Sequence, residues 1–80
     1  MSKSLYELAL DYDESIRNTQ QIVAAVRKQM REASARHDSF EVYSLSRKLE
    51  MLYEEIRDMK IVSEKLKKYY EDEKKQEGVA

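Results

Sequence analysis

The sequence predicts an all-α fold in which two long antiparallel helices form a hairpin, and two hairpins pair as a four-helix bundle. Three observations support this prediction. The 80 residues contain no Pro, a single Gly near the end and 39% charged residues, a composition typical of long helices and coiled coils. Apolar residues recur at alternating spacings of three and four along two stretches. This recurrence breaks once, at residues 35–39 (ARHDS).

The short length and the composition predict that the chain needs a partner. A chain of 80 residues makes one small domain, which we assign to residues 1–80. A domain of this size buries only about 60–65% of its unfolded surface, so a core of its own is marginally stable. The sequence has no Cys and a single His, so neither disulfides nor a His-based metal site can support it. We therefore expect a second protein chain to provide the missing stabilisation.

The first helix is predicted over residues 4–36. Ser4 and Glu7 have the spacing of a capping box, in which each side chain bonds the backbone N–H of the other residue. From there, one face of the helix collects apolar residues at helical spacing. The members of this face are Leu5, Leu8, Tyr12, Ile16, Thr19, Ile22 or Val23, Val26, Met30 and Ala33.

The second helix is predicted over residues 39–73, with Asp38 and Glu41 as its capping box. Its apolar face keeps a seven-residue repeat over four repeats and has one polar member, Ser63. The members are Val42, Leu45, Leu49, Leu52, Ile56, Met59, Ser63, Leu66 and Tyr70. Beyond them the apolar face is lost, so residues 74–80 are predicted to form a frayed tail.

A turn is predicted at residues 36–39 although no Gly or Pro marks it. The alternative is a single helix of some 70 residues, about 105 Å long. Extending the first repeat from Ala33 would place the next apolar residue at position 40, whereas the second repeat uses Val42. A continuous coiled coil absorbs insertions of three or four residues, so a shift of two favours a turn.

Folding the chain back at this turn pairs the two apolar faces. Residues whose numbers add to about 75 then oppose each other, which places Val26 opposite Leu49 and the bulky Tyr12 opposite the small Ser63. The charge distribution agrees, because residues 1–15, 16–37, 38–58 and 59–80 carry net charges of −3, +4, −3 and +1. An antiparallel pairing sets opposite signs beside each other, which selects the orientation more than it stabilises it.

Apolar residues outside the paired faces predict a homodimer. The main contacts between the helices are expected from Val26, Leu49, Leu52, Ile56 and Met59. Each large side chain that becomes fully buried contributes about 1.5–3 kcal/mol, so a second copy with two-fold symmetry would gain several kcal/mol by covering the others. The predicted partner surface consists of Tyr43, Met51, Tyr53, Ile61 and Tyr69, since tyrosine offers a rigid apolar ring with a polar tip.

The sequence predicts no catalytic residue, no cofactor site and no metal site, and thus no enzyme. His37 beside Asp38 is interpreted as a solvated loop histidine next to a helix cap, because no nucleophile or second ligand accompanies it. The Glu-x-x-His pattern of di-metal helix bundles does not occur. The acids at Asp11, Asp13 and Glu14 are expected to be solvated.

A basic strip on the first helix gives an alternative prediction, phosphate binding by Arg17, Lys28 and Arg31. We expect nucleic acid to be a poor partner, because the net charge of the whole chain is −1. No apolar run approaches the ~20 residues of a membrane span, and the N-terminus has no leader pattern, so we expect a cytoplasmic protein with no membrane partner.

Two short patterns carry a family resemblance. They are L-x2-L-x3-Y-x2-S (Leu5, Leu8, Tyr12, Ser15) and M-L-x3-I-x-D-M (Met51, Leu52, Ile56, Asp58, Met59). Together they resemble the N-terminal helical hairpin of sigma-factor-like late-gene regulators from phages of Gram-positive bacteria. The resemblance does not include the helix-turn-helix that follows in those proteins. It implies a protein-binding hairpin of phage or mobile-element origin without a DNA-reading unit.

The predicted function is therefore a small, non-enzymatic helical module that self-associates and binds another protein. The alternative is a small nucleic-acid-associated transcription regulator that uses the basic strip on the first helix.

Overall fold

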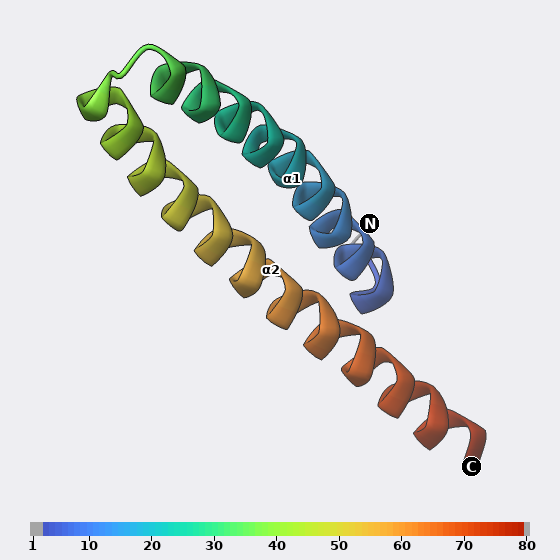
Figure 1. Cartoon of the computed structure of the whole chain (residues 1–80). Coiled ribbons are helices and arrows are strands. Elements are labelled where there is room, and N and C mark those ends of the chain that lie inside the picture. The colour runs from blue at the N-terminus through green and yellow to red at the C-terminus, as the bar shows by residue number, and fades with distance from the viewer. Residues whose placement is uncertain (1–2, 80) are drawn as a thin grey trace.

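The computed structural model describes residues 3–79, which form two α-helices joined by a short turn. Helix α1 spans Leu5–Ala35 and α2 spans Ser39–Val79. The helices lie side by side and run in opposite directions (Figure 1), so the predicted antiparallel hairpin is confirmed. The molecule is a rod of 66 × 19 × 16 Å. No helix within the described residues is long and apolar enough to cross a membrane.

The caps of both helices follow the sequence prediction. The Glu7 backbone N–H donates to Ser4 Oγ at 3.1 Å, and Ser4 precedes the first residue of α1. The Glu41 backbone N–H donates to Asp38 Oδ1 at 3.1 Å, directly before α2. The Glu41 carboxylate does not close a capping box but pairs with the Arg36 guanidinium at 2.7 Å, across the turn.

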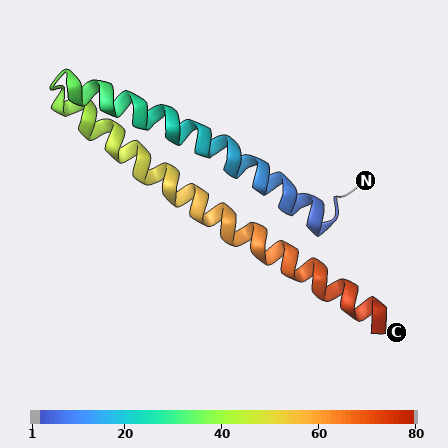
Figure 2. The ribbon, with the colours of Figure 1, turned by 45° about the vertical axis from the view of Figure 1, so that its right-hand side comes forward.

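α2 continues to Val79 instead of ending near residue 73. In Figures 1 and 2 this end of α2 projects beyond the start of α1. The sequence prediction placed a frayed tail here because the apolar face is lost. The backbone hydrogen bonds of a helix are internal to it, and Glu, Lys and Gln are strong helix formers, so α2 continues past the end of its apolar face. Residue 80 lies outside the described residues.

The turn closes α1 by a Schellman motif. The Asp38 backbone N–H donates to the Ala33 carbonyl at 2.9 Å, and the His37 N–H donates to the Ser34 carbonyl at 3.0 Å. His37 has a φ of 60°, the left-handed conformation that glycine usually supplies at this position. The hydrogen bonds thus hold a non-glycine residue where the sequence offers no Gly.

The core is a single seam between the two helices. The buried apolar residues that pack together are Ile16, Val23, Val26, Leu49 and Ile56, with Met30, Leu45, Leu52 and Met59 partly buried against them. All five residues predicted as the main contacts belong to this set. No large side chain in the described part of the chain is fully buried, as expected for a core only two helices thick.

The structure corrects one position of the α1 seam and decides another that the sequence prediction left open. Ala9 is 0% exposed and lies in the seam, whereas Leu8 is 39% exposed and lies beside it. Similarly, Val23 is buried and its neighbour Ile22 is exposed. A strict seven-residue repeat places only one residue of each adjacent pair in the seam. At the first of these positions, the small alanine lets the two helix backbones approach closely. The predicted place of Leu8 in the seam is therefore wrong.

Candidate interaction surface

The seven-residue repeat divides the surface of the hairpin into three faces. With the seam at positions a and d, residues at e and b lie on one side of the hairpin, those at g and c on the other, and those at f point outward. Position a falls on Ala9 in α1 and on Val42 in α2. The Lys67 ammonium lies 2.7 Å from the Asp13 carboxylate. Because both residues occupy e positions, this ion pair shows that the e positions of the two helices share one side.

The side formed by positions e and b is basic, and we call it the basic face. Over residues 5–70 it carries six bases and three acids, a net charge of +3. The bases are Arg17, Arg27 and Arg31 from α1 and Arg57, Lys60 and Lys67 from α2; the acids are Asp13, Glu50 and Glu64. Each helix contributes three bases, and the excess of positive charge is +2 from α1 and +1 from α2.

The side formed by positions g and c is acidic, and we call it the acidic face. Over the same residues it carries five acids and two bases, a net charge of −3. The acids are Asp11, Glu32, Glu41, Glu55 and Asp58; the bases are Lys48 and Lys65. Lys3 and Arg36, which lie outside the helices, pair with Asp11 and Glu41 at the two ends of this face. The excess of acid is therefore concentrated nearer the middle.

Both lateral faces also expose large apolar side chains. The basic face exposes Tyr6, Leu10, Tyr43 and Tyr53; the acidic face exposes Leu8, Ile22, Met51 and Tyr69; the outer face exposes Phe40 and Ile61. Single exposed apolar residues are normal on a protein surface, but a series along each side of a thin rod is typical of a contact surface.

The predicted partner surface is exposed but does not form one face. Tyr43 and Tyr53 lie on the basic face, Met51 and Tyr69 on the acidic face, and Ile61 on the outer face. Residues eight positions apart on a helix are rotated by about 80°, so residues at that spacing wind around α2. The structure thus divides the predicted surface between two opposite sides of the hairpin.

The predicted phosphate contacts are also divided. Arg17 and Arg31 lie on the basic face, about 21 Å apart along the helix axis, whereas Lys28 lies on the outer face. α2 adds Arg57 and Lys60 to the basic face near Arg17. The sequence analysis missed this addition because it considered the bases of each helix separately.

The basic face contains shallow hollows in the half of the hairpin next to the turn. One, of about 320 Å³, is lined by Gln20, Val23, Ala24, Arg27 and Arg31 of α1. A second, of about 360 Å³, adjoins it at both arginines and reaches Met30 and Val42 in the seam. A third, of about 480 Å³, begins at Ser34 and ends beside His37. The small side chains Ala24 and Ser34 flank the seam here, and the partly buried Met30 and Val42 line the second hollow.

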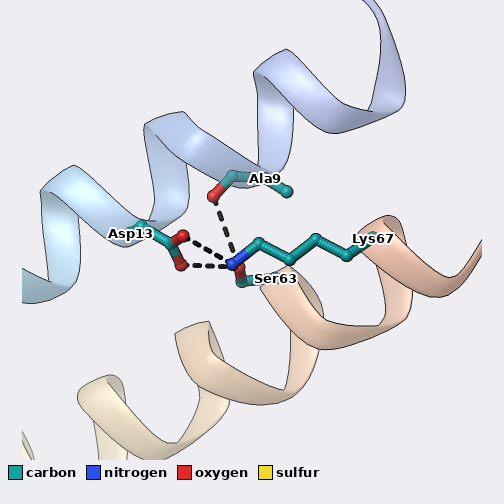
Figure 3. A network of polar contacts seen from close by, with 4 residues as sticks. All are labelled: Ala9, Asp13, Ser63 and Lys67. Carbon is teal, nitrogen blue, oxygen red and sulfur yellow. Dashed lines mark hydrogen bonds and ion pairs between the residues drawn. The ribbon is translucent and has the colours of Figure 1, made fainter. Parts of the chain in front are cut away.

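A network of polar side chains crosses the seam near the open end of the hairpin (Figure 3). The Ser63 hydroxyl donates to Asp13 Oδ1 at 2.6 Å and lies 3.3 Å from the Ala9 carbonyl oxygen. Lys67 Nζ donates to Asp13 Oδ2 at 2.7 Å. Ser63 therefore meets the α1 turn that contains its predicted partner Tyr12, and its hydroxyl bonds Ala9 and Asp13 on that turn.

The charges of this network are mutually stabilised. Hydrogen bonds from Lys67 and Ser63 lower the pKa of the Asp13 carboxyl, and the hydrogen bond to Asp13 raises the pKa of Lys67. Asp13 was expected to be solvated; its side chain is instead half-buried and accepts from Ser63 and Lys67. A polar residue inside a seam, with opposite charges at the flanking positions, is a sequence signal that would have indicated this contact.

The chemistry of the network is structural and not nucleophilic. Ser63 is 2% exposed, and its hydroxyl proton is directed to a carboxylate that already accepts from Lys67. A substrate could not reach this oxygen without separation of the helices. Within the described residues, no three His, Cys, Asp or Glu side chains are grouped so that they could hold a metal ion.

Comparison with protein-family models, with curated proteins and with solved structures found no match to this chain. The resemblance to phage late-gene regulators therefore stays a prediction. Geometry and charge are the remaining guides to function.

Proposed function

We propose that the chain is a non-enzymatic helical interaction module that associates with copies of itself. The observation that supports this proposal is the pair of lateral faces. Each carries four large exposed apolar side chains beside a seam that buries no large side chain completely. An interaction module presents such helix faces to another helical surface.

The energetics of a two-helix rod favour association. The 80-residue chain has a core one seam wide, so its stability is expected at the low end for a domain of this size. Each large side chain that becomes fully buried contributes about 1.5–3 kcal/mol. Covering one lateral face would bury up to four such side chains, and packing of a second hairpin is the usual way in which helical hairpins achieve this.

Sedimentation equilibrium over about 5–500 μM protein tests the proposal. We expect an average mass that rises above the 9.5 kDa of one chain as the concentration increases. A mass that stays at 9.5 kDa in a fully helical, cooperatively melting sample would refute self-association.

A matched pair of variants locates the interface. Ile22→Ser and Phe40→Ser remove apolar side chains that are both exposed, the first on a lateral face and the second on the outer face. Association should weaken in Ile22→Ser and stay unchanged in Phe40→Ser, although Phe40 is 82% exposed and the larger residue. Equal effects of both variants would contradict a role for the lateral faces.

The basic face supports a second candidate function, a small nucleic-acid-associated transcription regulator. Arg17 and Arg31, named from the sequence, share this face with three bases of α2, which enlarges the predicted strip. Phosphate contacts of this kind weaken steeply with salt. A mobility-shift titration at low salt tests the candidate, and no shift with protein at about 50 μM would remove it.

A further inference from the structure

We propose that copies of the hairpin associate side by side, in parallel and in register, with the basic face of one copy on the acidic face of the next. This inference rests on the proposed self-association and specifies its geometry. The contact is heterologous, because each copy uses two different surfaces.

The charges of the faces disfavour a symmetric contact. A two-fold dimer through the basic face would set +3 against +3, and one through the acidic face would set two acidic faces together. The acidic face carries −3 from its helix residues and −1 once Lys3 and Arg36 are counted. Like charges placed together across an interface cost several kcal/mol, whereas opposite charges select the partner surface and its orientation. Only a contact between unlike faces sets a net positive surface against a net negative one.

The order of charges along α2 specifies the register. On the basic face, position b carries Glu50, Arg57 and Glu64 in turn, a minus-plus-minus series. On the acidic face, the same heights carry Lys48, then Glu55 with Asp58, then Lys65, a plus-minus-plus series. All seven side chains are exposed. When a second copy lies beside the first without a shift, each charge of one series meets its opposite in the other.

The apolar side chains of α1 agree with this register. Ile22 projects from the acidic face, 47% exposed. At the same height, the basic face has the hollow of about 320 Å³ lined by Gln20, Val23 and Ala24. Parallel, unshifted packing places the Ile22 side chain of one copy at the hollow of the next. Leu8 on the acidic face is likewise level with Leu10 on the basic face, and both are exposed.

A heterologous contact has a consequence for assembly. Every pair of copies leaves one basic and one acidic face uncovered, so further copies add until the rotation between neighbours closes a ring, or else a filament grows. In a ring, the hairpins would stand parallel to the ring axis, and the outer-face residues Phe40 and Ile61 would stay outside the contacts.

Charge reversal tests the inference by sedimentation equilibrium at about 50 mM salt. Arg57→Glu makes position b of α2 acidic at all three heights and lowers the net charge of the basic face from +3 to +1, and Glu55→Lys with Asp58→Lys makes the middle of the acidic face basic. Each variant alone should lose association by at least about tenfold, because like charges then meet at the middle of the contact. An equimolar mixture of the two variants should associate again. Arg47→Glu, the matched reversal on the outer face, should associate as the unmodified chain does.

The outcomes separate this inference from the proposed function. If the unmodified chain stays monomeric, self-association and its geometry both fail. If it associates and Arg57→Glu does so equally well, self-association stands and the face-to-face geometry is overturned. If both variants lose association but their mixture does not recover it, the contact between unlike faces is again overturned.

Discussion

Replacing Ile56 with Asp is expected to unfold the hairpin at neutral pH. Ile56 is 8% exposed and packs in the seam with Val26 and Leu49. Loss of its buried apolar surface removes about 1.5–3 kcal/mol, and an unpaired carboxylate in its place costs about 3–5 kcal/mol more. A domain of 80 residues has a free energy of unfolding of about 4–12 kcal/mol, and a core one seam wide belongs near the lower limit. The substitution should therefore exceed the stability of the chain.

Circular dichroism at 222 nm and urea titration measure the effect. The matched control is Ile61→Asp, the same exchange on the same helix at an outward position that is 44% exposed. This control should stay folded with a free energy of unfolding within about 1 kcal/mol of the unmodified chain. If Ile56→Asp retains its helicity and a melting temperature within a few degrees of the control, the assignment of the seam is refuted.

Three smaller perturbations test the turn and the polar network. His37→Gly should raise the melting temperature by about 2–6 °C. A residue with a side chain pays roughly 0.5–1 kcal/mol net to hold a φ of 60°, and glycine does not. A lower melting temperature would contradict the left-handed turn. Ser63→Ala should lower the free energy of unfolding in urea by about 1 kcal/mol, and the exposed Ser44→Ala by less than about 0.5 kcal/mol. Asp13→Ala should lower the melting temperature near neutral pH. Because folding lowers the pKa of Asp13, the stabilisation it provides is present above its ordinary value of 3.8 and is lost as the pH falls through the lowered pKa. Folding raises the pKa of Lys67, so the stabilisation from this ion pair is fully present below the ordinary value of 10.5 and is lost as the pH rises through the raised pKa. A difference in melting temperature between Asp13→Ala and the unmodified chain that does not shrink at all as the pH is lowered below 3.8 would contradict this linkage.

The helices, their caps and the second seam are predictable from the sequence because each depends on residues a few positions apart. Ser4 with Glu7 and Asp38 with Glu41 mark both helix starts, and in the structure Ser4 and Asp38 each accept the predicted backbone N–H, although Glu41 does not complete its capping box. The apolar repeat of α2 keeps alternating spacings of three and four from Val42 to Met59, so its core residues Leu45, Leu49, Leu52, Ile56 and Met59 were assigned correctly. The shift of two residues between the repeats located the turn without a Gly or Pro.

The seam of α1 was harder to predict because it contains more apolar residues than one stripe can bury. Leu8 and Ala9 are both apolar neighbours, as are Ile22 and Val23, and local periodicity does not choose between them. Packing against α2 selects Ala9 and Val23, since a small residue at the contact lets the backbones approach. The rejected residues Leu8 and Ile22 become the exposed apolar side chains of the acidic face.

The sequence by itself determined that this chain forms two amphipathic helices and folds back near His37, because helical periodicity, capping and register are local properties. Only the tertiary structure decided which exposed residues share a side. Asp13 and Lys67 are 54 positions apart, and their ion pair exists only after the helices have paired. The same pairing places an excess of bases from both helices on one face and an excess of acids on the other, so a chain with a net charge of only −1 carries opposite charges on the two sides of the hairpin.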